Sequence, residues 1–239
     1  MIASDPAPAL PRDYPPAVLS RMTWMYRVFH YVLIPALLRL CTRLRVEGRE
    51  HLPHTGPLIL VSNHADNWDT YVTGLFLRDR VLNWMARPDG LASPWLGRYW
   101  RQFGAIPADA AGLRLALRIL KDGGAVGVFP EGVIAPGLVR AMPGSALLAL
   151  RSGAPVVPVA VWGTERIRAW SVFDPPRVTV RYGPPRVLAR VRGRGAQAAI
   201  DALMREIAGL LPPRYRGVYA LGDDRPMAEV DPHEETGRP

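Results

Sequence analysis

The chain has 239 residues, of which 49% are hydrophobic, and a formal net charge of +9 at neutral pH. This length suits one domain with a substantial core, and a mean hydropathy of +0.01 excludes a polytopic membrane protein. The single cysteine, Cys41, excludes an intrachain disulfide and a cysteine-based metal cluster.

The basic charge predicts an anionic partner. Residues 223–239 carry six acidic residues and two arginines, so the rest of the chain is more basic than the total suggests. A basic body suits lipid headgroups, the phosphates of acyl-CoA or nucleic acid. Because the chain has no nucleic-acid-binding motif and no basic helix with interleaved aromatic residues, we expect a membrane surface and no nucleic acid as partner.

Two segments are predicted before the main domain. Residues 1–16 are rich in proline and are expected to be irregular. Residues 17–44 contain an apolar and aromatic helix that arginines interrupt and that Pro35 is expected to kink. Since no apolar run reaches the roughly 18–20 residues of a membrane span, we expect two helices lying in the membrane interface. The alternative is a helix packed on the core of the domain.

From residue 57 onward, short apolar strands alternate with helices. We predict strands at 58–62, 81–85, 125–129, 156–161 and 178–181, and helices at 70–77, 94–103, 112–120, 144–151 and 196–211. This alternation is typical of an α/β fold, here a mixed, mostly parallel sheet covered by helices on both faces. The predicted domain covers residues 45–220, and residues 221–239 are predicted to be a disordered acidic tail.

A histidine and an aspartate follow the first of these strands. His64 and Asp69 are five residues apart, and within one helix their side chains would point about 140° apart. They can meet only if His64 lies on the loop and Asp69 in the first turn of the next helix, with Asp66 or Asn67 as the N-cap. Asp69 would then accept the Nδ1 proton of His64 and leave Nε2 as a base. The alternative is a capped helix beside a histidine with no chemical role.

Four sequence blocks, taken in order, indicate a family. They are Asn63-His64 with Asp69, then Gly104-Ala105-Ile106, then Phe129-Pro130-Glu131-Gly132, and then Pro155-Val156-Val157-Pro158-Val159. Together they resemble the glycerolipid acyltransferases related to bacterial 1-acylglycerol-3-phosphate acyltransferase. Trp84-Met85-Ala86-Arg87 also resembles a family segment that usually carries a basic residue. The resemblance extends over residues 45–215.

The resemblance implies the roles of particular residues. His64 and Asp69 would be catalytic. The residues expected to bind substrate or shape the site are Asn63, Arg87, Gly104, Ile106, Pro130, Glu131 and Gly132. No metal is implied, and no cofactor beyond acyl-CoA or acyl carrier protein as the co-substrate that donates the acyl group.

Two positions depart from the family pattern. Ala110 stands where the family usually has an arginine that contacts the phosphate of the acceptor, and Val133-Ile134-Ala135 replaces Thr-Arg-Ser. A bare phosphomonoester acceptor is therefore less expected, because arginine is the natural bidentate partner of that group. Other arginines can compensate from elsewhere, and the candidates are Arg87, Arg101, Arg114 and Arg140.

The resemblance implies transfer of an acyl group to the hydroxyl of a lysolipid, such as 1-acylglycerol-3-phosphate or a related lysophospholipid, in phospholipid synthesis. It also implies a peripheral or monotopic location at the cytoplasmic face of the cell membrane. The alternatives are acylation of another amphiphile such as an ornithine lipid, a histidine-dependent lipid or thioester hydrolase using Ser62 or water, and a lipid-binding module without activity.

Overall fold

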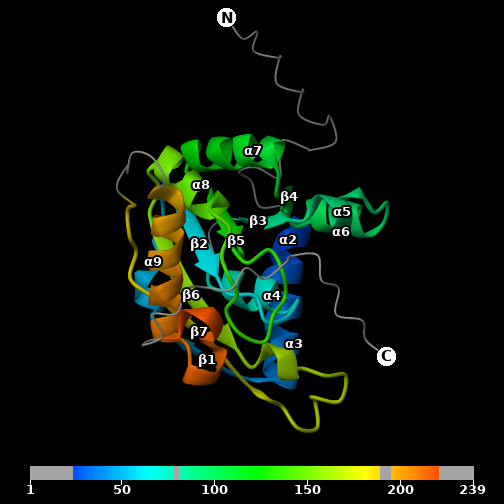
Figure 1. Ribbon diagram of the computed structural model, residues 1–239. Coiled ribbons are helices and arrows are strands. Elements are labelled where there is room, and N and C mark those ends of the chain that lie inside the picture. The colour runs from blue at the N-terminus through cyan, green and yellow to red at the C-terminus, as the bar shows by residue number, and fades with distance from the viewer. Residues whose placement is uncertain (1–23, 78–80, 189–194, 221–239) are drawn as a thin grey trace, which may run out of the picture.

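The computed structural model describes residues 24–77, 81–188 and 195–220, and within them one twisted sheet forms the centre of the molecule (Figure 1). Its seven strands lie in the order β1-β7-β6-β2-β5-β3-β4, and all neighbouring strands are parallel except the antiparallel pair β6 and β7. The strands are β1 (Arg43–Glu47), β2 (Leu58–Ser62), β3 (Leu82–Ala86), β4 (Ile106–Pro107), β5 (Ala125–Val128), β6 (Val156–Trp162) and β7 (Arg177–Tyr182). The α/β fold with a mixed, mostly parallel sheet is confirmed.

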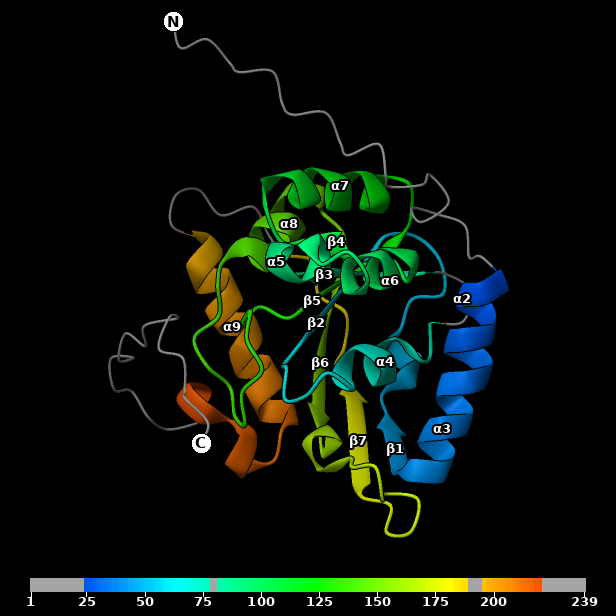
Figure 2. The same cartoon turned by 90° about the vertical axis from the view of Figure 1, so that its right-hand side faces the viewer.

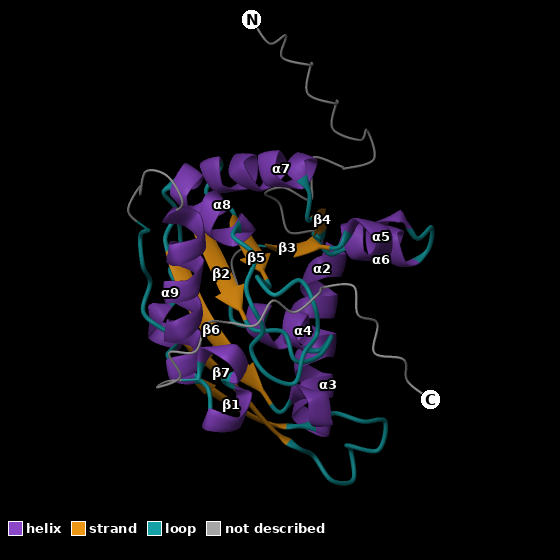
Figure 3. Cartoon of the chain, viewed as in Figure 1, coloured by secondary structure: helices purple, strands orange, loops and turns teal. Residues whose placement is uncertain are grey.

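Helices cover both faces of this sheet (Figure 3). One face packs against α7 (Ala110–Lys121), α8 (Gly144–Ser152) and α9 (Gly195–Leu210), and the other against α3 (Ile34–Cys41) and α4 (Asp69–Gly74). Strand β2 shows the reason, because Ile59 and Val61 point into the first core while Leu58 and Leu60 point into the second. A strand buried on both faces needs apolar residues at every position rather than at every second one.

The predicted elements after residue 57 are present, with boundaries displaced by a few residues. The helix predicted at 94–103 is shorter, α6 (Leu96–Gln102), and α5 (Pro88–Ala92) precedes it as a separate helix that the sequence analysis missed. The edge strands β1 and β4 were also missed. Strand β1 alternates charged and apolar residues at each of its five positions, a strand pattern that was overlooked, whereas β4 has two residues and carries no periodic pattern. Short turns complete the chain: η2 (Arg49–His51), η3 (Thr164–Arg166), η4 (Pro213–Tyr215) and η5 (Gly217–Tyr219).

The helical stretch at the start of the described residues runs along the sheet. It comprises α2 (Trp24–Val28), a π-helical turn η1 (Phe29–Leu33) and α3. In this π-helical turn the N–H of Ile34 donates a hydrogen bond to the carbonyl of Phe29, five residues back rather than four. The turn precedes Pro35, which has no N–H to donate. Ile34 and Leu38 pack in the core, while Val32, Leu37 and other apolar residues on the opposite face are exposed.

No helix among the described residues is long and apolar enough to cross a bilayer. The segments predicted at 1–16 and 221–239 lie outside the described residues. The division at residue 45 stays a prediction, and strand β1 begins at Arg43, two residues before it.

Candidate active site

The candidate site begins where β2 ends. The side-chain amide of Asn63 donates a hydrogen bond of 2.8 Å to the carbonyl of Val161, and the N–H of Val161 donates one of 2.8 Å back to Oδ1 of Asn63. These two bonds fasten the end of β2 to the end of β6. Asn63 is buried and does not line the cavity beside His64, and its two bonds fix the start of the loop that carries His64.

His64 and Asp69 are brought together as the spacing predicts. Nδ1 of His64 lies 3.2 Å from Oδ2 of Asp69, which is fully buried at the first residue of α4. The same oxygen accepts hydrogen bonds from the N–H groups of Ala65 (2.6 Å) and Asp66 (2.8 Å). The carboxylate therefore holds both the imidazole and the backbone of the loop that carries it.

The expected helix cap at Asp66 or Asn67 is wrong. The N-cap of α4 is Trp68, whose side chain makes no capping bond. Asp66 instead accepts a hydrogen bond from the N–H of Trp68 at 3.1 Å, which closes a turn within the loop. The N-cap thus lies one or two residues later than predicted, while α4 itself begins at Asp69, one residue before the predicted start of the helix.

Thr164 is a member of this network that the sequence analysis missed. Its hydroxyl donates a hydrogen bond of 2.6 Å to Oδ1 of Asp69, and the residue is fully buried in the turn η3 that follows β6. A threonine after a strand is too common to identify such a role. Only the pairing of β6 with β2 places it beside Asp69.

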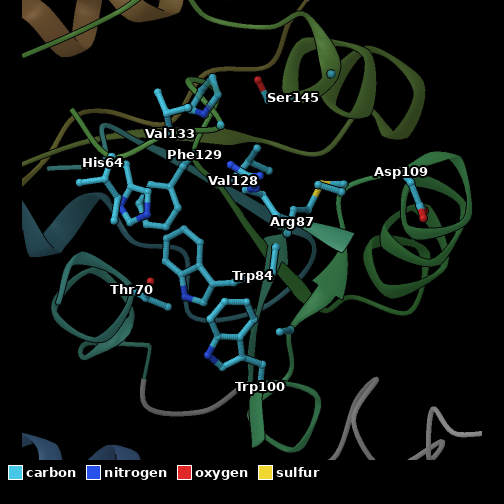
Figure 4. A pocket seen from close by; sticks show the side chains of 18 of the residues that line it. His64, Thr70, Trp84, Arg87, Trp100, Asp109, Val128, Phe129, Val133 and Ser145 are labelled. Carbon is cyan, nitrogen blue, oxygen red and sulfur yellow. The ribbon is translucent and has the colours of Figure 1, made fainter. Parts of the chain in front are cut away.

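The imidazole of His64 stands at the end of a stack of three rings. Its ring lies parallel to Phe129 with a centroid distance of 3.9 Å, and Phe129 lies parallel to Trp84 at 4.3 Å (Figure 4). Gly127 makes room for this stack, since a Cβ there would lie 2.5 Å from the indole of Trp84. With one face against Phe129 and Nδ1 on Asp69, the imidazole is held in one orientation, and Nε2 has no hydrogen-bond partner among the described residues.

Glu131 accepts backbone hydrogen bonds from two separate segments, one of which is the loop that carries His64. Its Oε2 accepts the backbone N–H of His64 at 2.9 Å, and its Oε1 accepts that of Val139 at 2.9 Å. Burial raises the pKa of the Glu131 carboxyl to about 7, and the nearby Asp69 acts in the same direction, although the two N–H donors lower it. Glu131 thus joins the loop that carries His64 to the 130–140 loop and does not line the cavity beside it.

A cavity of about 890 Å³ opens beside His64, between α4, α6, α7 and the 130–144 loop. Its walls are mainly apolar, and Figure 4 shows Trp84, Trp100, Val128 and Phe129 around it together with Arg87 and Asp109. Pro130 and Gly132 lie on its wall as predicted. Gly132 has φ of 67°, a left-handed conformation that residues with a Cβ rarely adopt, so a larger residue there would strain the backbone.

Among the described residues that line the cavity, the arginine is Arg87. Its guanidinium forms an exposed ion pair of 2.9 Å with Asp89. The other candidate cations do not line the cavity. Arg101 donates to the carbonyl of Leu91 at 2.7 Å, and Arg114 and Arg140 are exposed elsewhere. Ala110 and the pair Val133 and Ile134 do lie on the wall, where the family pattern expects polar or cationic groups.

Gly104 and Ile106 do not line the cavity either. Gly104 has φ of 87° in the turn after α6, and Ile106 is fully buried in β4 within the core. Both residues instead shape the segment that leads to α7. A glycine makes the turn, and the isoleucine anchors the short strand that leads to α7.

Comparison with known proteins identifies the family of the chain. The sequence profile described as Acyltransferase matches residues 43–162, which is half of the chain and includes His64, Asp69 and Glu131. The chain belongs to the acyltransferase family. The matched part of this acyltransferase runs from β1 to the end of β6 and so contains most of the sheet.

Individual relatives are distant. The chain is 24% identical to a 1-acyl-sn-glycerol-3-phosphate acyltransferase of Bacillus subtilis over 135 residues, which are 54% of this chain and 68% of that protein. It is 27% identical to a chloroplastic 1-acyl-sn-glycerol-3-phosphate acyltransferase of Arabidopsis thaliana, of which it spans 37%. The crystal structure of the 1-acyl-sn-glycerophosphate acyltransferase PlsC from Thermotoga maritima has the same fold, with a TM-score of 0.56 at 22% identity, over 78% of this chain and 86% of that one.

Proposed function

We propose that this acyltransferase moves an acyl group from a thioester, acyl-CoA or acyl carrier protein, to the hydroxyl of a lysolipid in phospholipid synthesis. The observation that carries the proposal is the position of His64. Its Nδ1 is fixed by buried Asp69, while its ring lines an apolar cavity large enough for an amphiphile. An oriented base beside a hydrophobic cavity suits a substrate that has both a hydroxyl and an acyl chain.

The reaction follows from this geometry. Nε2 of His64 accepts the proton of the acceptor hydroxyl while its oxygen attacks the thioester carbonyl, and such a base contributes about 10²–10⁴-fold to the rate. The tetrahedral intermediate then expels the thiolate, which takes the proton from the imidazolium as the carbon–sulfur bond breaks. Asp69 keeps the tautomer and stabilises the imidazolium, the role that the orienting carboxylate has in hydrolase triads.

The remaining predicted residues support this chemistry in two ways. Pro130, Gly132 and Arg87 line the cavity and are proposed to contact substrate. Asn63 and Glu131 hold the start of the loop in place through hydrogen bonds to backbone groups, and Gly104 and Ile106 position α7 at the cavity wall. The residues of this second set are proposed to influence activity by positioning the loop and α7, without contacting the substrate themselves.

The cavity favours an acceptor without a bare phosphomonoester. Ala110, Val133 and Ile134 present no cation to the site, and Arg87 is paired with Asp89. A lysophospholipid with a substituted phosphate, or another amphiphile such as an ornithine lipid, fits these walls better. Hydrolysis through a serine nucleophile is disfavoured, because Ser62 is fully buried and its hydroxyl donates to the carbonyl of Asn63 at 3.0 Å.

We propose further that the enzyme works peripherally at the cytoplasmic face of the membrane. The apolar residues on the outer face of the α2–α3 stretch support this location, since a helix that buries one face and exposes apolar side chains on the other suits the lipid interface.

The test measures acyl-CoA consumption over a panel of lysolipids, with products identified by mass. The wild-type chain is expected to need an added acceptor, and release of free fatty acid without one would identify a hydrolase instead. His64→Ala and Asp69→Asn are expected to lower turnover by about 10²–10⁴-fold while thermal melting shows a folded protein. Asp66→Asn is the matched control, because Asp66 lies in the same loop but accepts only the N–H of Trp68. Near-normal turnover of folded His64→Ala would overturn the mechanism.

A further inference from the structure

The loop between η3 and β7 exposes large apolar side chains to solvent. Trp170 and Phe173 are 65% and 88% exposed, and Val172 between them is also exposed. The loop is closed by its own hydrogen bonds, from the N–H of Arg168 to the hydroxyl of Ser171 (2.8 Å) and from the N–H of Ser171 to the carbonyl of Arg168 (3.0 Å). A third bond joins the N–H of Phe173 to the carbonyl of Trp170 at 3.0 Å. We call Trp170, Val172 and Phe173 the loop wedge.

The loop wedge adjoins the end of α3. The N–H of Arg43, two residues after α3 ends, donates a hydrogen bond of 2.8 Å to the carbonyl of Pro176 at the base of the loop. In Figure 2 the loop below β7, the α2–α3 stretch and the α5–α6 pair all lie on the side of the molecule that faces the viewer. Three separate parts of the chain thus project toward one side.

Each of these three parts exposes large apolar side chains. Trp95, in the connection between α5 and α6, is 86% exposed, and Leu96 beside it is exposed as well. The outer face of the α2–α3 stretch exposes Trp24, Val28, Val32, Leu33, Leu37 and Leu40. Exposed apolar residues that gather on one side of a protein mark an interaction surface, whereas single scattered ones do not.

The charges around the loop wedge identify the partner. Exposed Arg166, Arg168 and Arg177 flank it, and the acidic residues beside them are Asp174 in the loop and Glu165 in η3, whose half-buried carboxylate accepts hydrogen bonds from Gly163 and Tyr215. Exposed tryptophan and phenylalanine next to arginine suit the interface of an anionic bilayer, where the rings enter the headgroup region and the guanidinium groups meet lipid phosphates.

The cavity connects this surface to the site. Leu96 is exposed on the α5–α6 pair and also lines the cavity beside His64. The exposed apolar surface and the cavity therefore share this residue.

We propose that the loop wedge and Trp95 insert into an anionic membrane interface and, together with the α2–α3 face, set the orientation in which the cavity meets the bilayer. This inference rests on the proposed function, because it assumes that the substrate comes from lipid. It assigns membrane contact to a loop more than 125 residues from the N-terminal helix in sequence, held beside that helix by the pairing of β1 with β7.

The test is co-sedimentation of the full chain with vesicles of phosphatidylglycerol and phosphatidylcholine, and with vesicles of phosphatidylcholine alone. The double variant Trp170→Ser, Phe173→Ser is expected to lose about tenfold or more of its partition onto the anionic vesicles. The matched control is Val187→Ser, Val218→Ser, which removes two exposed apolar side chains on the side of the sheet that α9 covers, and it is expected to bind like wild type. Deleting α2–α3 is unsuitable, because Ile34 and Leu38 belong to the core.

Activity separates this inference from the proposed function. With a short-chain lysolipid dispersed as monomers, the loop variant is expected to turn over like wild type, and with acceptor presented in vesicles it is expected to be slower. Unchanged vesicle binding of the loop variant would overturn the inference. Equal binding of wild type to neutral vesicles would overturn the assignment to anionic lipid. Absence of transfer to every lysolipid in wild type would instead overturn the proposed function, whatever the vesicles show.

Discussion

The hydroxyl of Thr164 donates a hydrogen bond of 2.6 Å to the Oδ1 atom of Asp69, although the two residues lie 95 positions apart in the chain. Oδ2 of the same carboxylate faces His64 and two backbone N–H groups, so the two oxygens have different partners. Thr164 therefore fixes the rotation of the carboxylate about its own bond, and through it the direction in which the imidazole points.

Thr164→Val keeps the shape of the side chain and removes this hydrogen bond. We expect kcat to fall about tenfold with little change in KM, because the loss affects orientation of the base rather than substrate binding. The free energy of unfolding should fall by about 1–3 kcal/mol, since a buried carboxylate oxygen loses its donor. Steady-state kinetics and urea unfolding measure the two effects.

Thr73→Val is the matched control for this prediction. Thr73 is also fully buried, and its hydroxyl donates a 2.6 Å hydrogen bond to the backbone carbonyl of Asp69 rather than to its carboxylate. A similar loss of stability with near-normal kcat is expected. An equal loss of kcat in both variants would assign Thr164 a structural role only.

Gly127→Ala should disturb the ring stack from its far end. A Cβ at this position would lie 2.5 Å from the indole of Trp84, which supports Phe129 and, through it, His64. Overpacking of this kind costs about 1–3 kcal/mol of stability, and we expect kcat to fall with it. Gly209→Ala on α9 meets nothing within 4 Å and is expected to keep full activity. A folded Gly127→Ala protein with unchanged kcat would show that the stack does not orient the imidazole.

Glu131 makes stability depend on pH. Its pKa is raised by burial to about 7, so between the usual carboxyl value of about 4.5 and this value the folded protein holds a proton that the unfolded chain has released. This group therefore lowers the free energy of unfolding as the pH rises through that window, by up to about 3 kcal/mol. The Glu131→Gln side chain does not titrate. Its amide oxygen can accept only one of the two backbone N–H groups, because its NH₂ group cannot accept the other. The variant should therefore be less stable than wild type at pH 5.

Urea unfolding of both proteins at pH 5 and pH 8 measures the difference. We expect the difference in free energy of unfolding between wild type and Glu131→Gln to narrow from pH 5 to pH 8, because only wild type loses stability through the titration of this group. A gap that stays constant or widens between these two values would contradict the assignment.

Ala110→Arg should change the choice of acceptor. Ala110 is the first residue of α7 and lines the cavity, so an arginine there can meet a phosphomonoester, and one charge-assisted contact is worth roughly 10–150-fold in affinity. We expect the specificity constant for lysophosphatidic acid to rise relative to that for lysophosphatidylglycerol. Wild type should show little preference between the two, and a preference of a thousandfold or more for lysophosphatidic acid would contradict this.

Ala111→Arg is the control for that change. It adds the same charge one residue later, at a position that is not part of the described cavity wall. If Ala111→Arg raises the specificity constant for lysophosphatidic acid as much as Ala110→Arg does, general surface charge, rather than a contact in the cavity, attracts the acceptor.

The sequence by itself determined the fold class and the pair at the centre of the site. Strands such as β2, apolar at consecutive positions, predict burial on both faces and hence helices on both sides of a parallel sheet. The spacing of His64 and Asp69 predicts their contact, because five residues bring them together only at a junction between loop and helix, which is a local property of the chain.

Only the tertiary structure decided what surrounds that pair. Asn63, Glu131 and Thr164 make bonds to residues 67 to 98 positions away, and these bonds depend on β2 lying between β5 and β6. The order of strands in a sheet leaves no periodic pattern in the sequence, since it is set by how the whole chain packs its two cores. For the same reason the sequence did not show that Gly104 and Ile106 lie away from the cavity, or that the loop wedge lies beside α3. Local spacing determined the contact between His64 and Asp69, and long-range packing added Asn63, Glu131 and Thr164 around it.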